Sequence, residues 1–229
     1  MTEASLAKRV AAEALGTALL LAAIVGSGIM AERLSGGNAA QALLANTVAT
    51  GAALVALILT FGPISGAHFN PVVTLAFAAH GKLRREAALA YIAAQFAGAI
   101  AGVWLAHLMF GLPIFEVSVH ARGSFGELVG EFVATFGLLA LILSCTRHAP
   151  AAVPYGVAYY IVGAYWFTSS TSFANPAVTF ARSLTDSFTG IAPANVLGFT
   201  LAELAGGVVA FVLVSWLLAA SAPPPHGET

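Results

Sequence analysis

Long apolar runs dominate the pattern of hydrophobic and polar positions along this chain. A helix that crosses a lipid bilayer needs roughly 20 mainly apolar residues. Five runs meet that length, at about residues 11–30, 40–61, 87–110, 125–145 and 196–220. A sixth run, at about residues 153–171, is slightly more polar. The pattern predicts an all-α membrane protein with six transmembrane helices.

Two further apolar runs are too short to cross a bilayer, and each follows an Asn-Pro pair. Residues 72–79 follow Asn70 and Pro71, and residues 177–184 follow Asn175 and Pro176. Asparagine is a good helix cap, and proline is favoured in the first helical turn. Each short run is therefore predicted to be a re-entrant half-helix that begins at its Asn-Pro pair.

The second half of the chain repeats the motifs of the first half in the same order. Glu13 in the first apolar run matches Glu131 in the fourth, and an Asn-Pro pair follows in each half. Because each half has three spans, an odd number, the two copies must insert with opposite orientation. We expect a single transmembrane domain over residues 1–229, with inverted repeats at about 8–110 and 125–220.

Composition and charge placement support a membrane location and suggest an orientation. Of the 229 residues, 59% are apolar and 8% charged, which excludes an ordinary soluble domain. The net charge of −1 suggests no nucleic-acid partner. With six crossings and a cytoplasmic N-terminus, six basic residues lie inside: Lys8, Arg9, Lys82, Arg84, Arg85 and Arg147. Only Arg33, Arg122 and Arg182 remain outside, so the positive-inside rule predicts two cytoplasmic termini.

The duplicated Asn-Pro half-helices resemble those of the major intrinsic protein family, the aquaporins and aquaglyceroporins. The resemblance covers about residues 8–220 and implies the aquaporin fold, with the two half-helices meeting at their N-termini in a pore. Two positive helix ends and two asparagine amides would then interrupt a proton wire and repel cations. The family is also typically homotetrameric, which implies the same assembly for this chain in the cell inner (plasma) membrane.

The first of the two family motifs departs from Asn-Pro-Ala. The second copy, Asn175-Pro176-Ala177, is intact, whereas the first is Asn70-Pro71-Val72. Valine keeps an apolar side chain but adds two methyl groups. We expect slightly altered packing between the half-helices and intact proton exclusion.

The family's selectivity filter is the larger departure. Counting from the motifs as the family is aligned places Thr50, Gly163, Ser172 and Val178 at the filter. Water-selective members carry an aromatic residue, a histidine, a small residue and an arginine there. Val178 replaces the arginine, so the resemblance implies a wider constriction without a fixed charge.

Four other residues are candidates for roles around the pore. By resemblance, His68 faces the cytoplasmic half of the pore, and Glu13 and Glu131 hold the re-entrant loops. Arg182 lies one helical turn beyond Val178, roughly 6 Å further out. It is expected either to line the outer vestibule or to extend its side chain to the membrane interface.

The resulting functional expectation is a passive channel for small uncharged solutes. The expected solutes are water, glycerol- or urea-like molecules and metalloid acids. Arsenicals are included because residues 173–186 resemble a bacterial subgroup linked to arsenic resistance. A mainly water-selective aquaporin is the alternative, and a proton-coupled secondary transporter is a more distant one. The chain shows no metal-ligand spacing, nucleotide motif or nucleophile-base pair, so we expect no metal, no cofactor and no enzymatic activity.

Overall fold

A computed structural model describes residues 4–219 as a bundle of α-helices. Within this range the chain forms eight α-helices and no strand. They are α1 (Leu6–Leu34), α2 (Ala39–Ser65), α3 (Pro71–Ala79), α4 (Arg85–Phe110), α5 (Phe125–His148), α6 (Val153–Phe167), α7 (Pro176–Arg182) and α8 (Pro193–Leu217). Both chain termini and the predicted end of the last span at Ala220 lie outside the described residues.

Five of the described helices are long and apolar enough to cross a membrane: α1, α2, α4, α5 and α8. The sixth predicted span, α6, has 15 residues and follows a short 3₁₀ turn, Pro150–Ala152. It ends at Phe167, four residues before the predicted end at Thr171. The polar residues that follow leave the helix and lead to the second Asn-Pro pair, which explains the overestimate.

The two halves of the chain pack in the same way. In the first half α1 packs on α4 and α2, and in the second half α5 packs on α8 and α6. Glycine permits both tight crossings: a Cβ on Gly98 would overlap the Ala14 carbonyl oxygen, and one on Gly206 would overlap the Phe132 carbonyl oxygen. The fold is thus the aquaporin fold, with inverted three-helix repeats.

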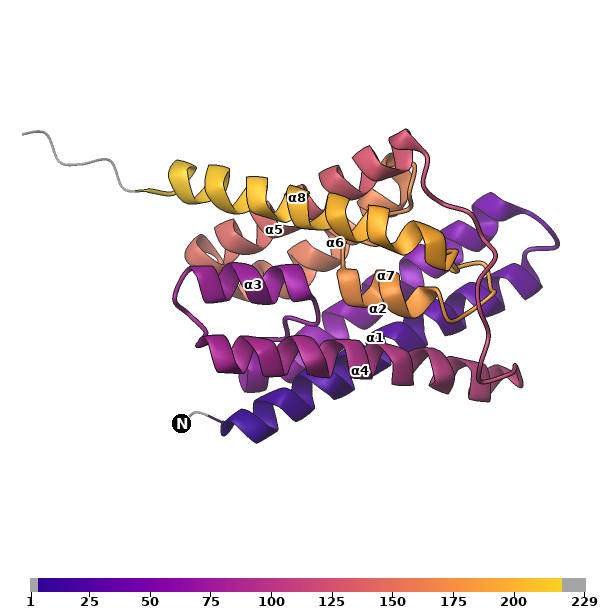
Figure 1. Ribbon diagram of the computed structural model, residues 1–229, viewed down its shortest axis with the longest axis horizontal. Coiled ribbons are helices and arrows are strands. Elements are labelled where there is room, and N and C mark those ends of the chain that lie inside the picture. Colours follow the sequence, from indigo (N-terminus) through magenta and orange to yellow (C-terminus); the bar gives the residue numbers. More distant parts are fainter. Residues whose placement is uncertain (1–3, 220–229) are drawn as a thin grey trace, which may run out of the picture.

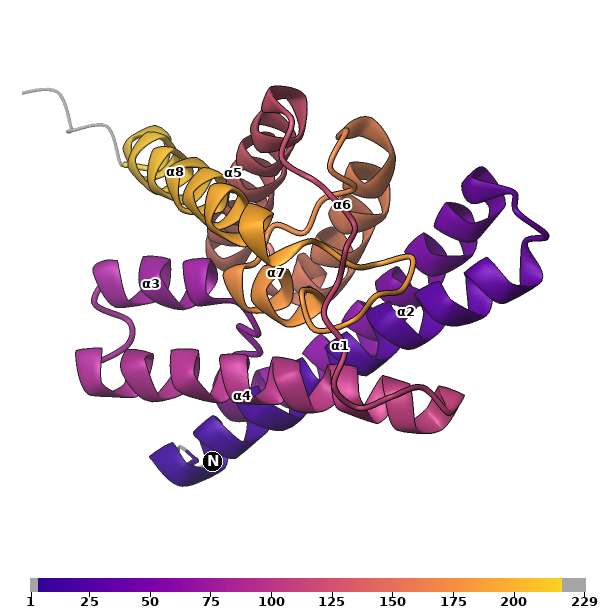
Figure 2. The same ribbon diagram turned by 45° about the vertical axis from the view of Figure 1, so that its right-hand side comes forward.

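The half-helices α3 and α7 pack against the longer helices and point in opposite directions (Figure 1). In Figure 1 their N-terminal ends face each other near the centre of the molecule, and their C-terminal ends point to opposite ends of the long axis. Figure 2 shows α7 surrounded by longer helices, and α7 contacts α1, α3, α4 and α8. The start of α1 and the end of α8 lie at the same end of the bundle (Figure 1).

The outer surface of the bundle carries large apolar side chains. Leu89, Leu108, Tyr159, Leu197 and Trp216 are each more than 60% exposed. Such a surface is unfavourable in water and suits contact with lipid. Buried polar side chains gather instead around α3 and α7, where the site lies.

Candidate functional site

Each half-helix begins with an asparagine that caps it. The Asn70 Oδ1 atom accepts a hydrogen bond from the Val72 backbone N–H at 2.9 Å. The Asn175 Oδ1 atom accepts one from the Ala177 N–H at 3.0 Å. The side-chain oxygen of each asparagine is therefore occupied by its own helix, and only the amide NH₂ group is left to donate elsewhere.

The two asparagines also tie the two halves of the protein together. Asn70 Nδ2 donates to the carbonyl oxygen of Ala174 at 2.7 Å, and Asn175 Nδ2 donates to the carbonyl oxygen of Phe69 at 2.8 Å. Each acceptor is the residue just before the opposite asparagine. An NH₂ group has two hydrogens, so each amide keeps one N–H for a solute in the adjacent cavity, which both asparagines line.

The loops that lead into the half-helices share an unusual backbone conformation. Phe69 and Ala174, directly before the asparagines, have φ angles of 49° and 50°. Ala67 and Ser172 have φ angles of 48° and 53°. Left-handed backbone at residues other than glycine costs on the order of 1–3 kcal/mol each and persists only where surrounding contacts fix it.

The buried carboxylates Glu13 and Glu131 supply such contacts. Glu13 accepts the backbone N–H groups of His68 at 3.0 Å and Phe69 at 2.7 Å. Glu131 accepts those of Phe173 at 2.9 Å and Ala174 at 2.7 Å. Both carboxylates are fully buried, and they satisfy N–H groups that the broken helices leave without a backbone acceptor.

A long, mostly apolar cavity passes between the two repeats and along both asparagines. From the predicted filter, Thr50, Ser172 and Val178 line it. The hydroxyl groups of Thr50 and Ser172 are buried and have no hydrogen-bond partner among the described residues. They are therefore free to bond a solute. Apolar side chains from four helices form much of the remaining wall: Leu20, Ile24, Leu54, Ile58, Leu138, Ile142, Val157 and Ile161.

The fourth predicted filter position, Gly163, is not among the residues that line the cavity. The α6 residues that face it at this level are Ile161 and Tyr165, which are four residues apart and share one face of the helix. Gly163 lies between them in sequence and thus on another face, where a Cβ would meet Phe167. The α6 face that lines the cavity is thus not the face that carries Gly163.

The structure also corrects the expected packing of Val72. Its side chain is buried with Ala76, Leu139 and Ala210 rather than against α7. A Cβ on Gly207 of α8 would overlap the Val72 Cγ1 atom. The added methyl groups are thus accommodated at α8, and Val72 does not line the cavity.

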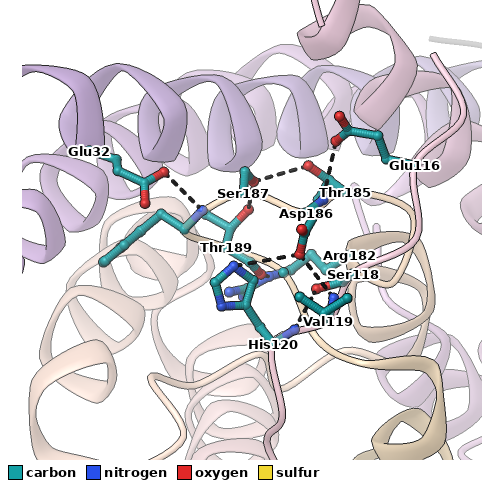
Figure 3. A network of polar contacts seen from close by, with 12 residues as sticks. Glu32, Glu116, Ser118, Val119, His120, Arg182, Thr185, Asp186, Ser187 and Thr189 are labelled. Carbon is teal, nitrogen blue, oxygen red and sulfur yellow. Dashed lines mark hydrogen bonds and ion pairs between the residues drawn. The ribbon is translucent and has the colours of Figure 1, made fainter. Parts of the chain in front are cut away.

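Arg182 lines the cavity with its side chain buried, so it does not extend to the membrane interface. Its guanidinium carbon sits 3.3 Å from the centroid of the Phe173 ring, and its Nε donates to the Thr189 carbonyl oxygen. Figure 3 shows Arg182 beneath the segment that carries Thr185 and Thr189. The guanidinium is held by its own loop and not at the Val178 position.

The loops before α5 and after α7 form a polar network at the end of the bundle opposite the start of α1 (Figure 1). The Val119 N–H donates to Asp186 Oδ1 at 2.9 Å, and His120 Nε2 lies 3.7 Å from the same carboxylate atom (Figure 3). The Phe188 N–H donates to Glu32 at the end of α1. These contacts connect the loop after α7 both to the loop before α5 and to the end of α1.

His68 occupies the cavity wall next to the first asparagine. Its Nδ1 atom is 3.1 Å from the Thr74 hydroxyl oxygen, and its ring packs against Phe77 and Tyr91. The Tyr91 hydroxyl accepts from Arg9 Nε at 2.8 Å near the start of α1. His68 therefore lies in the half of the cavity that leads to the end of the bundle where α1 starts.

Two residues near the site, Tyr165 and Arg122, were not predicted from the sequence. Tyr165 could have been found from its spacing of four residues from Ile161 on a helix with a buried face. Arg122 belongs to the long segment before α5, yet it donates to the Gly190 carbonyl oxygen at 2.8 Å and lies 5.3 Å from the Phe173 ring centroid. Partial burial lowers the pKa of Arg122, while Glu127 and Glu131 nearby favour its charged form.

Comparison with known proteins identifies the family. The sequence model of the Major intrinsic protein family matches residues 1–165. The chain belongs to the major intrinsic protein family. A curated relative, Aquaglyceroporin AqpS of Rhizobium meliloti, is 55% identical over 97% of this chain and 95% of its own length. Aquaporin Z of Bradyrhizobium diazoefficiens is 30% identical over 92% and 93%.

A solved structure supports the same fold. The aquaglyceroporin from Plasmodium falciparum aligns with a TM-score of 0.65 at 20% identity, over 93% of this chain and 100% of that one. Members of the major intrinsic protein family are membrane channels that pass water and small solutes. This chain is accordingly an integral membrane channel for small solutes and not an enzyme. Family membership also favours a passive channel over the alternative function of a proton-coupled transporter.

Proposed function

We propose that this member of the family is a wide-filter channel that passes water together with glycerol- or urea-like solutes and undissociated metalloid acids, including arsenicals. The observation that carries the proposal is Val178 on the cavity wall directly after Asn175-Pro176-Ala177. An apolar side chain there leaves no fixed charge at the position where water-selective members carry arginine. Arg182, the nearest basic residue on α7, is held at Phe173 and Thr189.

The chemistry of the wall suits solutes that are partly apolar and carry hydroxyl groups. Thr50 and Ser172 offer free hydroxyls on the cavity wall, and Asn70 and Asn175, which line the same cavity, each offer an N–H. A polyol can direct its oxygens to these groups while its carbon atoms contact the leucine and isoleucine side chains. Undissociated arsenous acid is likewise small, neutral and bears hydroxyl groups. Tyr165, in place of Gly163, completes the proposed filter as a further hydrogen-bonding group.

The two asparagine amides are proposed to exclude protons from this pathway. A water between them would accept from both N–H groups and direct its own hydrogens outward, which interrupts a continuous donor chain. The N-termini of α3 and α7 add positive potential at the same place. Both features hinder protons and cations and do not narrow the pore, so neutral molecules can still pass through a wide filter.

The membrane and the assembly are proposed from charge placement and the family. Lys8, Lys82 and Arg147 flank helix ends at one end of the bundle, which supports a cytoplasmic location for that end and for both termini. A homotetramer in the inner (plasma) membrane is what family membership supports. Each protomer contains its own cavity, so solute passage does not require a shared pore.

A mainly water-selective pore is the competing function. Glycerol facilitators of the family carry charged residues at the positions of Thr179 and Ser183, which are both buried here. At these two positions the chain resembles the water-selective members instead. Osmotic swelling of proteoliposomes that contain the purified full chain separates the two functions. We expect passage of water, glycerol and arsenous acid, with flux proportional to the solute gradient. Passage of water alone would reject the wide-filter proposal.

A further inference from the structure

The two repeats differ at one buried position next to the loop-holding carboxylates. Gln95 in α4 and Glu203 in α8 occupy equivalent places in the two halves, and both are fully buried. Gln95 Nε2 donates to Glu13 Oε2 at 2.9 Å and to the Thr74 hydroxyl at 2.9 Å. In the first half, an amide N–H group thus joins the loop-holding carboxylate to the half-helix.

In the second half, a carboxyl group stands where the amide donor should be. Glu203 Oε1 accepts from the Asn175 backbone N–H at 3.1 Å and from the hydroxyl of Thr179, the counterpart of Thr74. Its other oxygen, Oε2, is buried and has no partner among the described residues. The carboxyl group of Glu131 lies beside it, because Glu131 Oε2 accepts from the Ala174 backbone N–H and Glu203 Oε1 accepts from the next N–H along the chain, that of Asn175.

Three consecutive backbone N–H groups therefore donate hydrogen bonds to two adjacent carboxyl groups. Those of Phe173 and Ala174 donate to Glu131, and that of Asn175 donates to Glu203. Two ionised carboxylates side by side in a buried site repel each other strongly, so one of the pair keeps a proton unless a cation is bound to both.

No such cation bridges the pair among residues 4–219. Of the two arginines in this region, Arg182 donates from Nε to the Thr189 carbonyl oxygen, and Arg122 donates to the carbonyl oxygens of Gly190, Ser170 and Phe188. The ion pairs that the described residues form involve neither Glu131 nor Glu203.

We propose that Glu203 is protonated and donates from Oε2 to Glu131, and that it thereby acts as a positioning residue for Asn175. The proton resides on Glu203 because both oxygens of Glu131 accept backbone N–H groups, which favour its ionised form, whereas Oε2 of Glu203 has no donor among the described residues. The neutral carboxyl group then makes the same connection as Gln95 in the first half. This inference goes beyond the proposed function, because it does not depend on which solute crosses the pore.

Infrared spectroscopy of the full chain in lipid tests the protonation directly. The wild-type protein should show the carbonyl stretching band of a protonated buried carboxylic acid at neutral pH, and Glu203→Gln should lose it. Glu127→Gln is the control, because Glu127 caps the exposed start of α5, and it should keep the band. Persistence of the band in Glu203→Gln, or its absence from the wild type, would overturn the proposal.

Two further measurements keep the proposal testable if one variant folds poorly. Gln95→Glu recreates the carboxyl pair in the first half and should add a second band of the same kind; no added band would contradict the proposal. Solute flux tells whether residue 203 acts as a hydrogen-bond donor or only fills space. Glu203→Gln should retain flux because its amide donates to Glu131, whereas Glu203→Leu should lose it. Equal loss in both folded variants would contradict a donor role.

Discussion

The Val72 side chain fills the space that a side chain at Gly207 would need. The pair joins α3 to α8, so the exception in the first Asn-Pro-Ala motif is matched by a glycine far along the chain. Val72 faces away from the cavity, which leaves the asparagine donors unaffected by the substitution. Substitutions at Val72 and Gly207 therefore test the packing of α3 against α8 and not the selectivity of the pore.

Gly207→Ala should destabilise the protein, because its methyl group would overlap Val72 in a well-packed interior. Overpacking of this kind costs typically about 1–3 kcal/mol. The double variant Val72→Ala with Gly207→Ala should recover most of that loss. Thermal unfolding of the detergent-purified protein measures both effects. Gly62→Ala, where a Cβ meets nothing within 4 Å, is the control, and equal melting temperatures for Gly207→Ala and Gly62→Ala would disprove the contact.

Replacing either pore asparagine by aspartate should weaken charge exclusion. Asn70→Asp and Asn175→Asp keep the capping oxygen but lose the Nδ2 donor to the opposite loop, at a cost of about 1–3 kcal/mol for the unsatisfied group. Both variants should admit more protons or cations than the wild type. A trapped pH dye in proteoliposomes reports the leak. Asn38→Asp makes the same change at the exposed cap of α2, and a leak no greater than in this control would contradict the assignment.

Arg182 is expected to discourage cations at the outer part of the cavity. Arg182→Gln removes the positive charge over the Phe173 ring, and cation leak should rise while the flux of neutral solutes persists. Arg182→Lys keeps the charge and should leak less than the glutamine variant. Potassium efflux and glycerol swelling, measured on the same vesicles, give both readouts. The proposed role of Arg182 fails if Arg182→Gln changes neither quantity.

Glu13 should be required mainly for folding. It accepts two backbone N–H groups, the Ser65 hydroxyl and the Gln95 amide. Hydrogen bonds to a charged group contribute roughly 1.5–3 kcal/mol each. In Glu13→Gln an NH₂ group replaces one of the accepting oxygens, and it cannot accept hydrogen bonds from these donors. We expect a lower melting temperature and less folded protein, both measured after extraction. Glu127→Gln again provides an exposed comparison, and similar stability of the two variants would refute the loop-holding role.

The aquaporin fold could be predicted from the sequence because its signals are local. Apolar run length identified five spans, and the two Asn-Pro pairs marked the starts of α3 and α7 at Pro71 and Pro176. The internal repeat then implied opposite orientations. The end of α6 was less predictable, because the polar residues that follow Phe167 could extend a helix or leave it.

The details of the site depended on contacts between distant segments. The bond from Asn70 to the Ala174 carbonyl joins residues 104 positions apart, and no local pattern reveals it. The same holds for Val72 against Gly207 and for Arg122 beside Phe173. The face of α6 that lines the cavity was hard to predict for a different reason. Direction around a helix changes by about 100° per residue, so an error of one residue in a count from the motif selects another face.

The most direct test of the wide-filter account is the flux of glycerol and arsenous acid through Val178→Arg, compared with wild type and with Val178→Leu. Arginine would place a large, charged side chain on the cavity wall next to Thr50 and Ser172. Stopped-flow swelling of proteoliposomes should show glycerol and arsenous acid flux strongly reduced in Val178→Arg, water flux largely kept, and Val178→Leu close to wild type. Unchanged glycerol and arsenous acid flux in folded Val178→Arg would contradict the account.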